Sequence, residues 1–355
     1  MRHLPFLEHD SRESGAQYLE DLATGYWFSE ALFTAVELDV FSRLDPGGSS
    51  AAQMAQLLEC DAPAVERFLD ALCAMGLATY NGGFYYNTPI ASNYLVKGKE
   101  GYQGNSILWR RYLAAPWGNL KGSLKAGGRV PDSVAREPGQ LARRIRSYIR
   151  AMDDVARIKI REILPLFGPV SGNILDVGAG SGAVSAGFLE RFPGAVATLL
   201  DLPDVLDCAV ELLRPRKLED RMTFCPANIL EPWPVSEGAF DLVVLSNVLH
   251  AYAQTEAVHL LDEARRCLTS DGFLVVHDFF REHRPQKAAL FDLNMLLNTY
   301  NGKVFAAEWV REQLTGKGLH VTDLIALGSD TGVIVASRDA EKLAGLRLAV
   351  PEIVL

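Results

Sequence analysis

The six residues 178–183, read as GAGSGA, constrain the fold of this chain more than any other stretch. They follow an apolar run, NILDV, and lead into AVSAGFLERF, which has apolar residues at helical spacing. Glycine loses more conformational freedom on folding than any other residue, so three alternate glycines indicate left-handed turns or close approach to a ligand. The pattern predicts a strand, a tight loop and a helix whose N-terminal amides face an anionic or polar group.

Strand-like and helix-like segments alternate after this loop. Further strand candidates are VATLLDL, MTFCPAN, FDLVVLSN, GFLVVHDF, HVTDLIAL and VIVASR. Helical segments separate most of them, and short apolar strands that alternate with helices are typical of a parallel sheet covered on both faces. Only GSDTG joins the last two strands, which is too short for a parallel crossover. The sequence therefore predicts an α/β domain with a mostly parallel sheet whose last strand is antiparallel.

The chain before residue 160 is predicted to be mainly helical. Ser50 and Asp61 stand where their side-chain oxygens can cap two short helices. The turn 81–83, Asn-Gly-Gly between aromatic residues, favours a tight hairpin. Helices followed by a hairpin are the order of a winged helix, a fold that often binds DNA. The second of these helices carries Glu66, Asp70 and a single arginine, so dimerisation or substrate capping suits it better than contacts with bases.

Composition argues against several classes of protein. The 355 residues carry a formal net charge of −9, whereas a protein that follows nucleic-acid phosphates needs a basic face. The apolar stretches fall short of the ~20 residues of a membrane-spanning helix, and the N-terminus lacks a signal-peptide core. The five cysteines are scattered without a C-x-x-C pair, which predicts reduced thiols, a cytoplasmic protein and no metal site. We therefore expect no nucleic-acid partner and no membrane association.

Two cofactors suit the glycine loop. GAGSGA fits the dinucleotide pattern G-x-G-x-x-G/A, although a single match has low specificity. Asp201 follows Gly178 by 23 residues, at the end of the next strand candidate. A carboxylate there can accept hydrogen bonds from ribose hydroxyls or cap the helix that follows. Asp176 precedes the loop, where its charge would oppose a second phosphate but could face a cationic amino-acid group. This favours S-adenosylmethionine over a dinucleotide.

The motifs LDVGAGSG, LLDLP and LSNVLHAYAQTEAVHLLDEARRCLTSDGFLVVHDF together resemble the S-adenosylmethionine-dependent small-molecule O-methyltransferases. That family includes plant caffeate and flavonoid enzymes and acetylserotonin O-methyltransferase, and the N-terminal segment is similar to its winged-helix dimerisation domain. The resemblance implies a class I methyltransferase fold with a Rossmann-like sheet, and a homodimer whose N-terminal domains interlock. We expect a dimerisation domain over 1–100, a helical connector over 101–163, a catalytic domain over 164–340 and a tail over 341–355.

The resemblance also implies which residues bind the cofactor. These are two loop glycines, the ribose-binding acid, two residues at the adenine and two after the fourth strand of the domain: Gly178, Gly180, Asp201, Asn228, Ile229, Ser246 and Tyr252. The chain departs from the family's pattern at three of them. Asn228 stands where an adenine-contacting aspartate is usual, Ser246 where plant members often have lysine, and Tyr252 where tryptophan is common.

Methyl transfer from a sulfonium requires that the acceptor oxygen be held against the methyl carbon and lose its proton. His250 follows the strand candidate FDLVVLSN and is the expected general base, since imidazole titrates near neutral pH. Asp278 matches the acid that orients this histidine in the family. A second orienting acid is not matched, because Ala307 takes its position and Glu308 is one residue late.

Four more residues match substrate-pocket positions of the family, in a pocket expected between the helical region and the strand edges: Tyr148, Met152, Met295 and Thr299. The whole predicts methyl transfer to a hydroxyl of an aromatic or enolic small molecule in secondary metabolism. Methylation of carbon or nitrogen, or a reaction without methyl transfer, would use the same fold and cofactor. An NAD-dependent oxidoreductase and a winged-helix DNA-binding regulator are the alternatives from other classes.

Overall fold

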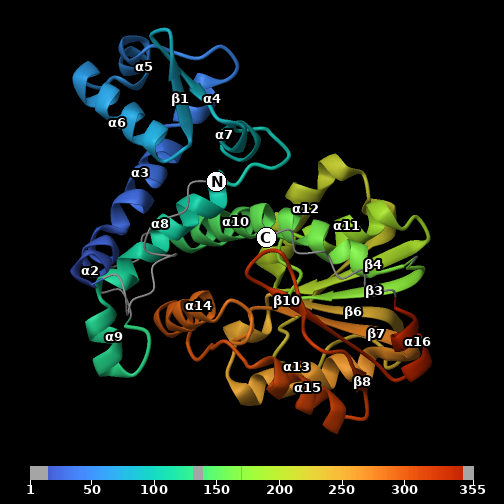
Figure 1. The fold of residues 1–355 in the computed structure, drawn as a ribbon. Coiled ribbons are helices and arrows are strands. Elements are labelled where there is room, and N and C mark those ends of the chain that lie inside the picture. The colour runs from blue at the N-terminus through green and yellow to red at the C-terminus, as the bar shows by residue number, and fades with distance from the viewer. Residues whose placement is uncertain (1–14, 131–138, 169, 347–355) are drawn as a thin grey trace. The chain divides into compact units, whose positions relative to one another are not determined.

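The computed structural model describes residues 15–130, 139–168 and 170–346. The chain divides into two compact units, Met1–Tyr112 and Leu113–Leu355 (Figure 1). No helix within the described ranges is both long and apolar enough to cross a membrane. The finer division into four parts stays a prediction, and residues 347–355 of the expected tail lie outside the described part of the chain.

Short helices and one hairpin build the first unit. Its elements are α2 (Gly15–Thr24), α3 (Tyr26–Glu37), α4 (Val40–Leu44), α5 (Ala51–Leu58), α6 (Ala62–Ala74), β1 (Ala78–Asn81), β2 (Phe84–Asn87), α7 (Pro89–Tyr94) and the start of α8 (Gly104–Gly118). The predicted caps are confirmed: the Ser50 hydroxyl accepts from the Gln53 N–H, and Asp61 accepts from the N–H three residues on. In α6, Asp70 accepts a hydrogen bond from the Tyr85 hydroxyl at 2.8 Å, so this acidic helix anchors the hairpin.

Eight strands of the described chain form the sheet of the second unit. They are β3 (Gly172–Val177), β4 (Ala195–Asp201), β5 (Met222–Pro226), β6 (Phe240–Ser246), β7 (Leu268–Asp278), β8 (His320–Val321), β9 (Ile325–Ala326) and β10 (Gly332–Ser337). Their order is β5-β4-β3-β6-β7-β10-β8, with β9 paired to β10. Strands β3 to β7 pair in parallel, and β10 is antiparallel to β7, which confirms the reversed last strand. The single strand predicted for HVTDLIAL is instead two short ones, β8 and β9.

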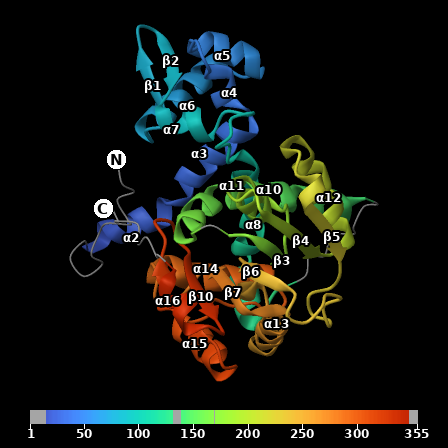
Figure 2. The same cartoon turned by 90° about the vertical axis from the view of Figure 1, so that its right-hand side faces the viewer.

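Helices cover both faces of this sheet (Figures 1 and 2). One face is covered by α10 (Gln140–Ile163), α11 (Ala183–Arg191), α12 (Pro203–Leu213) and α16 (Ala340–Gly345), and the other by α13 (Gln254–Cys267) and α15 (Ala307–Gly316). The unit also contains α9 (Leu120–Ala126), which lies away from the sheet and contacts α14 (Pro285–Asn298). Successive strand residues point to opposite faces. Val243 and Leu245 of β6 therefore join an apolar core with α13 and α15, while Val244 joins a second core with α11 and α12.

The carboxyl ends of the parallel strands meet at one edge of the sheet. The chain runs outward from β3 to β4 and β5, then returns to the other side of β3 with β6. Ligands of open α/β sheets bind at such a reversal. The register pairs the last residue of β3 with Leu200 of β4 and Leu245 of β6. The next residue of each segment, Gly178, Asp201 and Ser246 respectively, therefore lies at the same level of this edge.

The glycine loop offers a test of the fold. Gly182 has φ +73°, and a Cβ there would lie 2.6 Å from a Leu199 methyl carbon and 2.7 Å from a Leu213 methyl carbon. Both leucines are buried. We expect Gly182→Ala to lower the free energy of unfolding by about 2–4 kcal/mol, through strain and crowding together. Gly180 has φ +57° but open space around it, so Gly180→Ala should cost only about 1–2 kcal/mol. Urea denaturation of both variants measures the difference, and equal losses would contradict the packing described here.

Candidate functional site

A cavity of about 280 Å³ lies at the carboxyl edge of the sheet, over the reversal between β3 and β6. Small-molecule sites commonly occupy clefts of roughly this size or larger. All of the residues predicted to bind the cofactor line it: Gly178, Gly180, Asp201, Asn228, Ile229, Ser246 and Tyr252. The buried Asp176, at the end of β3, lines it as well. The structure thus brings together one set of residues that the sequence scatters over 76 positions.

Asp201 ties the glycine loop to β4. Its Oδ2 accepts from the Gly180 N–H at 2.8 Å, and its Oδ1 accepts from the Leu202 N–H at 2.7 Å. Burial raises the pKa of Asp201, and these two N–H donors oppose that rise. A carboxylate has about four lone-pair positions, so acceptor capacity remains for hydroxyl donors in the cavity. The helix-capping alternative does not hold, because Leu202 is the N-cap residue of α12.

Gly178 and Gly180 bring bare backbone to the cavity wall. Their φ angles, +64° and +57°, are left-handed conformations that glycine adopts without strain. A Cβ on Gly178 would lie 3.0 Å from a Val248 methyl carbon. The left-handed backbone favours glycine at both positions, and at Gly178 the contact with Val248 leaves little room for a side chain.

The far side of the cavity is formed by the segment after β5 and by Tyr252. The Asn228 side chain is already engaged: its Oδ1 accepts from the Leu230 N–H at 3.1 Å, and its Nδ2 donates to Glu231 at 3.4 Å. Ile229 beside it is buried. Burial, followed by the nearby Asp201 charge, raises the pKa of Tyr252 to about 12, so its phenol is neutral. An amide, an aliphatic side chain and a neutral aromatic ring suit a flat heterocycle.

His250 and Asp278 form a close pair. The His250 Nδ1 lies 2.5 Å from the Asp278 Oδ1, and the His250 backbone N–H donates to Asp278 Oδ2 at 3.2 Å. The Phe279 N–H also donates to Oδ1, at 2.7 Å. Because a carboxylate only accepts, Nδ1 carries the imidazole proton and Nε2 keeps a free lone pair. The arrangement makes Nε2 a candidate proton acceptor.

Two phenylalanines enclose the His250 ring. Phe279 and Phe291 stack with ring centroids 3.8 Å apart, and each meets His250 edge to face, at 5.8 and 5.1 Å. Only 13% of the His250 side chain is exposed. Sequence reasoning did not single out these phenylalanines. A signal was present, since Phe279 follows Asp278 directly and Phe291 lies one helical turn before Met295.

The residues predicted to line the substrate pocket separate into two places. Tyr148 and Met152 of α10 line the same cavity as the glycine loop. Met295 is buried in α14, and the Thr299 hydroxyl donates to the Met295 carbonyl at 2.7 Å. A Cβ built on Gly302 would touch both the Thr299 hydroxyl and the His250 carbonyl, which places Thr299 beside the His250 backbone.

The segment KVFAAEWV contributes no carboxylate to His250. Glu308 is exposed, and its Oε2 forms an ion pair with Arg311 Nη1 at 2.7 Å. At the start of α15, the Ala307 N–H donates to the carboxylate of Glu282, which lies in the segment before α14. Within the described ranges, no group of three His, Cys, Asp or Glu side chains is arranged to hold a metal ion.

Two family models match this chain. The model of the O-methyltransferase domain matches residues 136–320, and the model of the O-methyltransferase dimerisation domain matches residues 20–97. The first covers the glycine loop, the cavity and the histidine–aspartate pair.

Curated and solved proteins resemble the chain over most of its length. A 3-hydroxy-5-methyl-1-naphthoate 3-O-methyltransferase from Streptomyces sahachiroi is 29% identical over 83% of this chain and 88% of its own. An N,N-dimethyltransferase, OxyT, from Streptomyces rimosus is also 29% identical, over 80% and 83%. The crystal structure of human N-acetylserotonin methyltransferase with S-adenosylmethionine matches with a TM-score of 0.80 and 26% identity, over 94% of this chain and all of that one.

The buried carboxyl at the end of β3 gives a pH prediction. Asp176 accepts hydrogen bonds from the Ser185 hydroxyl at 2.7 Å and the Ser185 N–H at 3.2 Å, yet burial raises its pKa from 3.8 to about 7. Between these values the folded chain keeps a proton that the unfolded chain has released. This group therefore lowers stability by up to ~1.4 kcal/mol per pH unit as pH rises through that window.

We expect Asp176→Asn to remove this loss. Urea denaturation between pH 4 and 7.5 should show that the variant gains stability relative to the wild type as pH rises. Parallel pH profiles of the two proteins would show that Asp176 is ionised throughout and that its burial is offset by the Ser185 bonds.

Proposed function

Because this chain belongs to the O-methyltransferase family, we propose that it moves the methyl group of S-adenosylmethionine to a phenolic or enolic hydroxyl of a small aromatic acceptor, with His250 as general base. The observation that carries the proposal is the His250–Asp278 pair at the same sheet edge as the cavity. Membership of this family argues against the two alternative functions that the sequence motifs alone left open, an NAD-dependent oxidoreductase and a DNA-binding regulator.

The cavity residues fit S-adenosylmethionine. Asp201 would accept from the ribose hydroxyls, Asn228, Ile229 and Tyr252 would surround the adenine, and the loop at Gly178 would hold the amino-acid end. The bound cofactor supplies an electrophilic methyl group on a positively charged sulfur. Asp176 and Asp201 bring two carboxyl groups to the cavity lining, which supports a cationic ligand over a pyrophosphate.

His250 removes the proton that the acceptor hydroxyl must lose. Its Nε2 accepts the proton while Asp278 holds Nδ1–H and stabilises the imidazolium that results. A positioned base of this kind contributes typically ~10²–10⁴ in rate, and orientation of the two reactants contributes more. Asp278 therefore acts through His250, as the residue that fixes its tautomer and direction.

Phe279 and Phe291 support an aromatic acceptor. Their stacked rings and His250 form a largely apolar surface with one polar nitrogen. Aromatic rings prefer offset or edge-to-face contacts with other rings, worth roughly 0.5–1.5 kcal/mol beyond burial. The name of one relative, a 3-hydroxy-5-methyl-1-naphthoate 3-O-methyltransferase, gives a fused aromatic acid as its acceptor, and such an acceptor would suit this surface.

The N-terminal unit supports a homodimer. It matches the family's dimerisation domain, and four large apolar side chains of α2 and α3 are exposed: Leu19, Leu22, Tyr26 and Trp27. Contiguous exposed apolar residues mark association surfaces. We propose that this face pairs with a second copy of the chain.

We predict that His250→Gln lowers kcat for methyl transfer by about 10²–10⁴ and leaves S-adenosylhomocysteine affinity within about twofold of wild type. Asp278→Asn should lower kcat by a comparable factor, since it favours the wrong tautomer. A panel of hydroxynaphthoates, catechols and aromatic amines, with products analysed by mass spectrometry, identifies an acceptor first. A wild-type rate in His250→Gln would rule out the base, and products methylated solely at nitrogen would rule out the hydroxyl acceptor.

For the dimer, we predict that Trp27→Glu shifts the chain from dimer to monomer in sedimentation velocity, because a charge would be buried on association. Trp27 is 59% exposed in the single chain, so the variant should fold normally. Leu57→Glu on α5, at 53% exposure, is the matched control and should stay dimeric. A dimer in both variants would place the interface elsewhere.

A further inference from the structure

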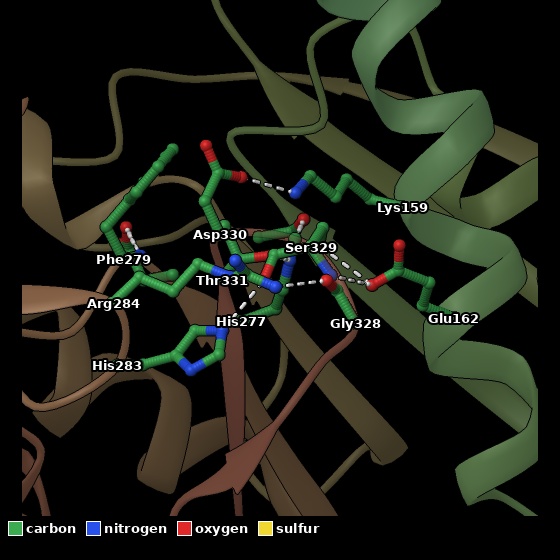
Figure 3. Close-up of polar contacts among 12 residues, drawn as sticks. Lys159, Glu162, His277, Phe279, His283, Arg284, Gly328, Ser329, Asp330 and Thr331 are labelled. Carbon is green, nitrogen blue, oxygen red and sulfur yellow. Dashed lines mark hydrogen bonds and ion pairs between the residues drawn. The ribbon is translucent and has the colours of Figure 1, made fainter. Parts of the chain in front are cut away.

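A line of hydrogen bonds leads from the cavity to Glu162 of α10, and Figure 3 shows the part of it that runs from His277 to Glu162. It starts at Ser246, which lines the cavity, and passes through His277 at the end of β7. It then crosses Thr331 and Ser329, in the turn before β10, and ends at Glu162 of α10. The mechanism proposed above uses none of the last four residues.

Four contacts make up this line, and the one between Thr331 and Ser329 is the longest. The Ser246 hydroxyl lies 2.8 Å from His277 Nδ1, and His277 Nε2 lies 2.9 Å from the Thr331 hydroxyl. The Thr331 and Ser329 hydroxyls are 3.3 Å apart. The Ser329 hydroxyl donates to Glu162 Oε2 at 2.7 Å, and the Ser329 N–H donates to the same oxygen at 3.2 Å.

His277 is a neutral imidazole at physiological pH. It is fully buried, as is Thr331. Burial, assisted by the nearby Lys159 charge, lowers the pKa of His277 to about 3. A neutral imidazole has one N–H donor and one acceptor nitrogen, and its partners decide which is which. Its backbone carbonyl also accepts from the Asn247 N–H at 2.7 Å, so His277 is hydrogen-bonded to both Ser246 and Asn247 of the cavity lining.

Counting protons gives the line a direction. Four contacts join the five groups, and four protons are available, one each from Ser246, His277, Thr331 and Ser329. The Glu162 carboxylate supplies none. Every contact holds one proton only if each group donates toward Glu162. In any other arrangement two oxygens, or an oxygen and a nitrogen, face each other without a proton.

This direction settles what Ser246 offers to the cavity. Thr331 donates to Ser329, and His277 donates from Nε2 to Thr331. His277 Nδ1 is then unprotonated and takes the Ser246 hydroxyl proton. Ser246 is left with lone pairs alone toward the cavity, so it acts there as an acceptor. Lysine, which plant relatives often have at this position, could only donate.

The sheet order indicates which part of the cofactor reaches Ser246. With ribose at Asp201 on β4 and adenine beyond it after β5, the amino-acid chain must extend the other way, past β3 toward β6. Ser246 is the last residue of β6 and lies at the level of Gly178. Next to it, the Asn247 Oδ1 is buried and has no hydrogen-bond partner among the described residues, although Asn247 also lines the cavity.

We propose that the line from Glu162 through His277 fixes Ser246 as an acceptor, and that Ser246 and Asn247 together receive the α-ammonium group of S-adenosylmethionine. The proposal rests on the placement of the cofactor proposed above. Glu162, Ser329, Thr331 and His277 are positioning residues, since each acts through Ser246. An ammonium has three N–H donors and no acceptor, which suits two neighbouring oxygens.

The first test is the tautomer of His277 in the unmodified protein. Nitrogen-15 NMR of histidine-labelled protein identifies the protonated ring nitrogen, and the signal is assigned by its loss in His277→Gln. We expect Nε2 to be protonated in the wild type. Protonation at Nδ1 would overturn the proposal, whatever the variants do. In Thr331→Val, where Nε2 loses its acceptor, we expect a population protonated at Nδ1, and Thr322→Val is the matched control.

The second test is calorimetric binding without acceptor, so that His250 and the acceptor class play no part in it. Ser246→Ala should weaken S-adenosylhomocysteine by about tenfold, a typical value for a hydrogen bond to a charged group. It should weaken decarboxylated S-adenosylhomocysteine as much, and leave an analogue with hydrogen in place of the ammonium unchanged. Ser337→Ala, which removes a buried hydroxyl of β10, is the control.

The opposite selectivity, with the loss confined to ligands that carry the carboxylate, would show that Ser246 donates and would overturn the proposal. Equal affinity of Ser246→Ala and wild type for all three ligands would overturn it as well. In both cases wild-type binding of S-adenosylhomocysteine would leave the methyltransferase assignment intact. A wild type that binds the ligand but methylates no acceptor would instead contradict the proposed function.

Discussion

The parallel pairing of β3 with β4 on one side and β6 on the other is the constraint on which the rest depends. Hydrogen-bond register fixes the level at which each strand ends, so loops far apart in sequence emerge side by side. Gly178, Asp201 and Ser246 owe their proximity to this pairing alone. The hydrogen bond from the Gly180 N–H to Asp201 then holds the glycine turn against β4.

Three buried polar side chains at this edge of the sheet, Asp176, His277 and Asp278, have defined hydrogen-bond partners. Asp176 accepts from Ser185, Asp278 accepts from three N–H groups around His250, and His277 joins two hydroxyls. Burying a polar group without a partner costs about 1–3 kcal/mol, so these bonds offset a substantial penalty. They also fix geometry, since every acceptor is matched to a donor in one direction. The hydrogen bonds that offset the cost of burying these polar side chains therefore also fix their orientation in the site.

Much of this arrangement could be predicted from the sequence. Short apolar runs between helical segments predict the strands, and Ser50 and Asp61 predict helix starts, because these signals are local. Asp201 and His250 are predictable because Asp201 ends β4 and His250 lies four residues after β6, and the ends of these parallel strands must meet. Phe291 was not found, since its contact with His250 depends on how α14 packs. The sequence of the turn GSDTG predicts only a short connection, because its hydrogen bonds to residues 54 and 167 positions away have no local signature.

The central claim is that this sheet edge binds S-adenosylmethionine through Asp201, once per chain. The most direct measurement is calorimetric titration of the purified protein with S-adenosylhomocysteine and, separately, with NADH, for wild type and Asp201→Asn. The account predicts one site per chain for the first ligand, an affinity lowered at least about tenfold in the variant, and no saturable binding of NADH. Saturable NADH binding that depends on Asp201, without binding of S-adenosylhomocysteine, would contradict it.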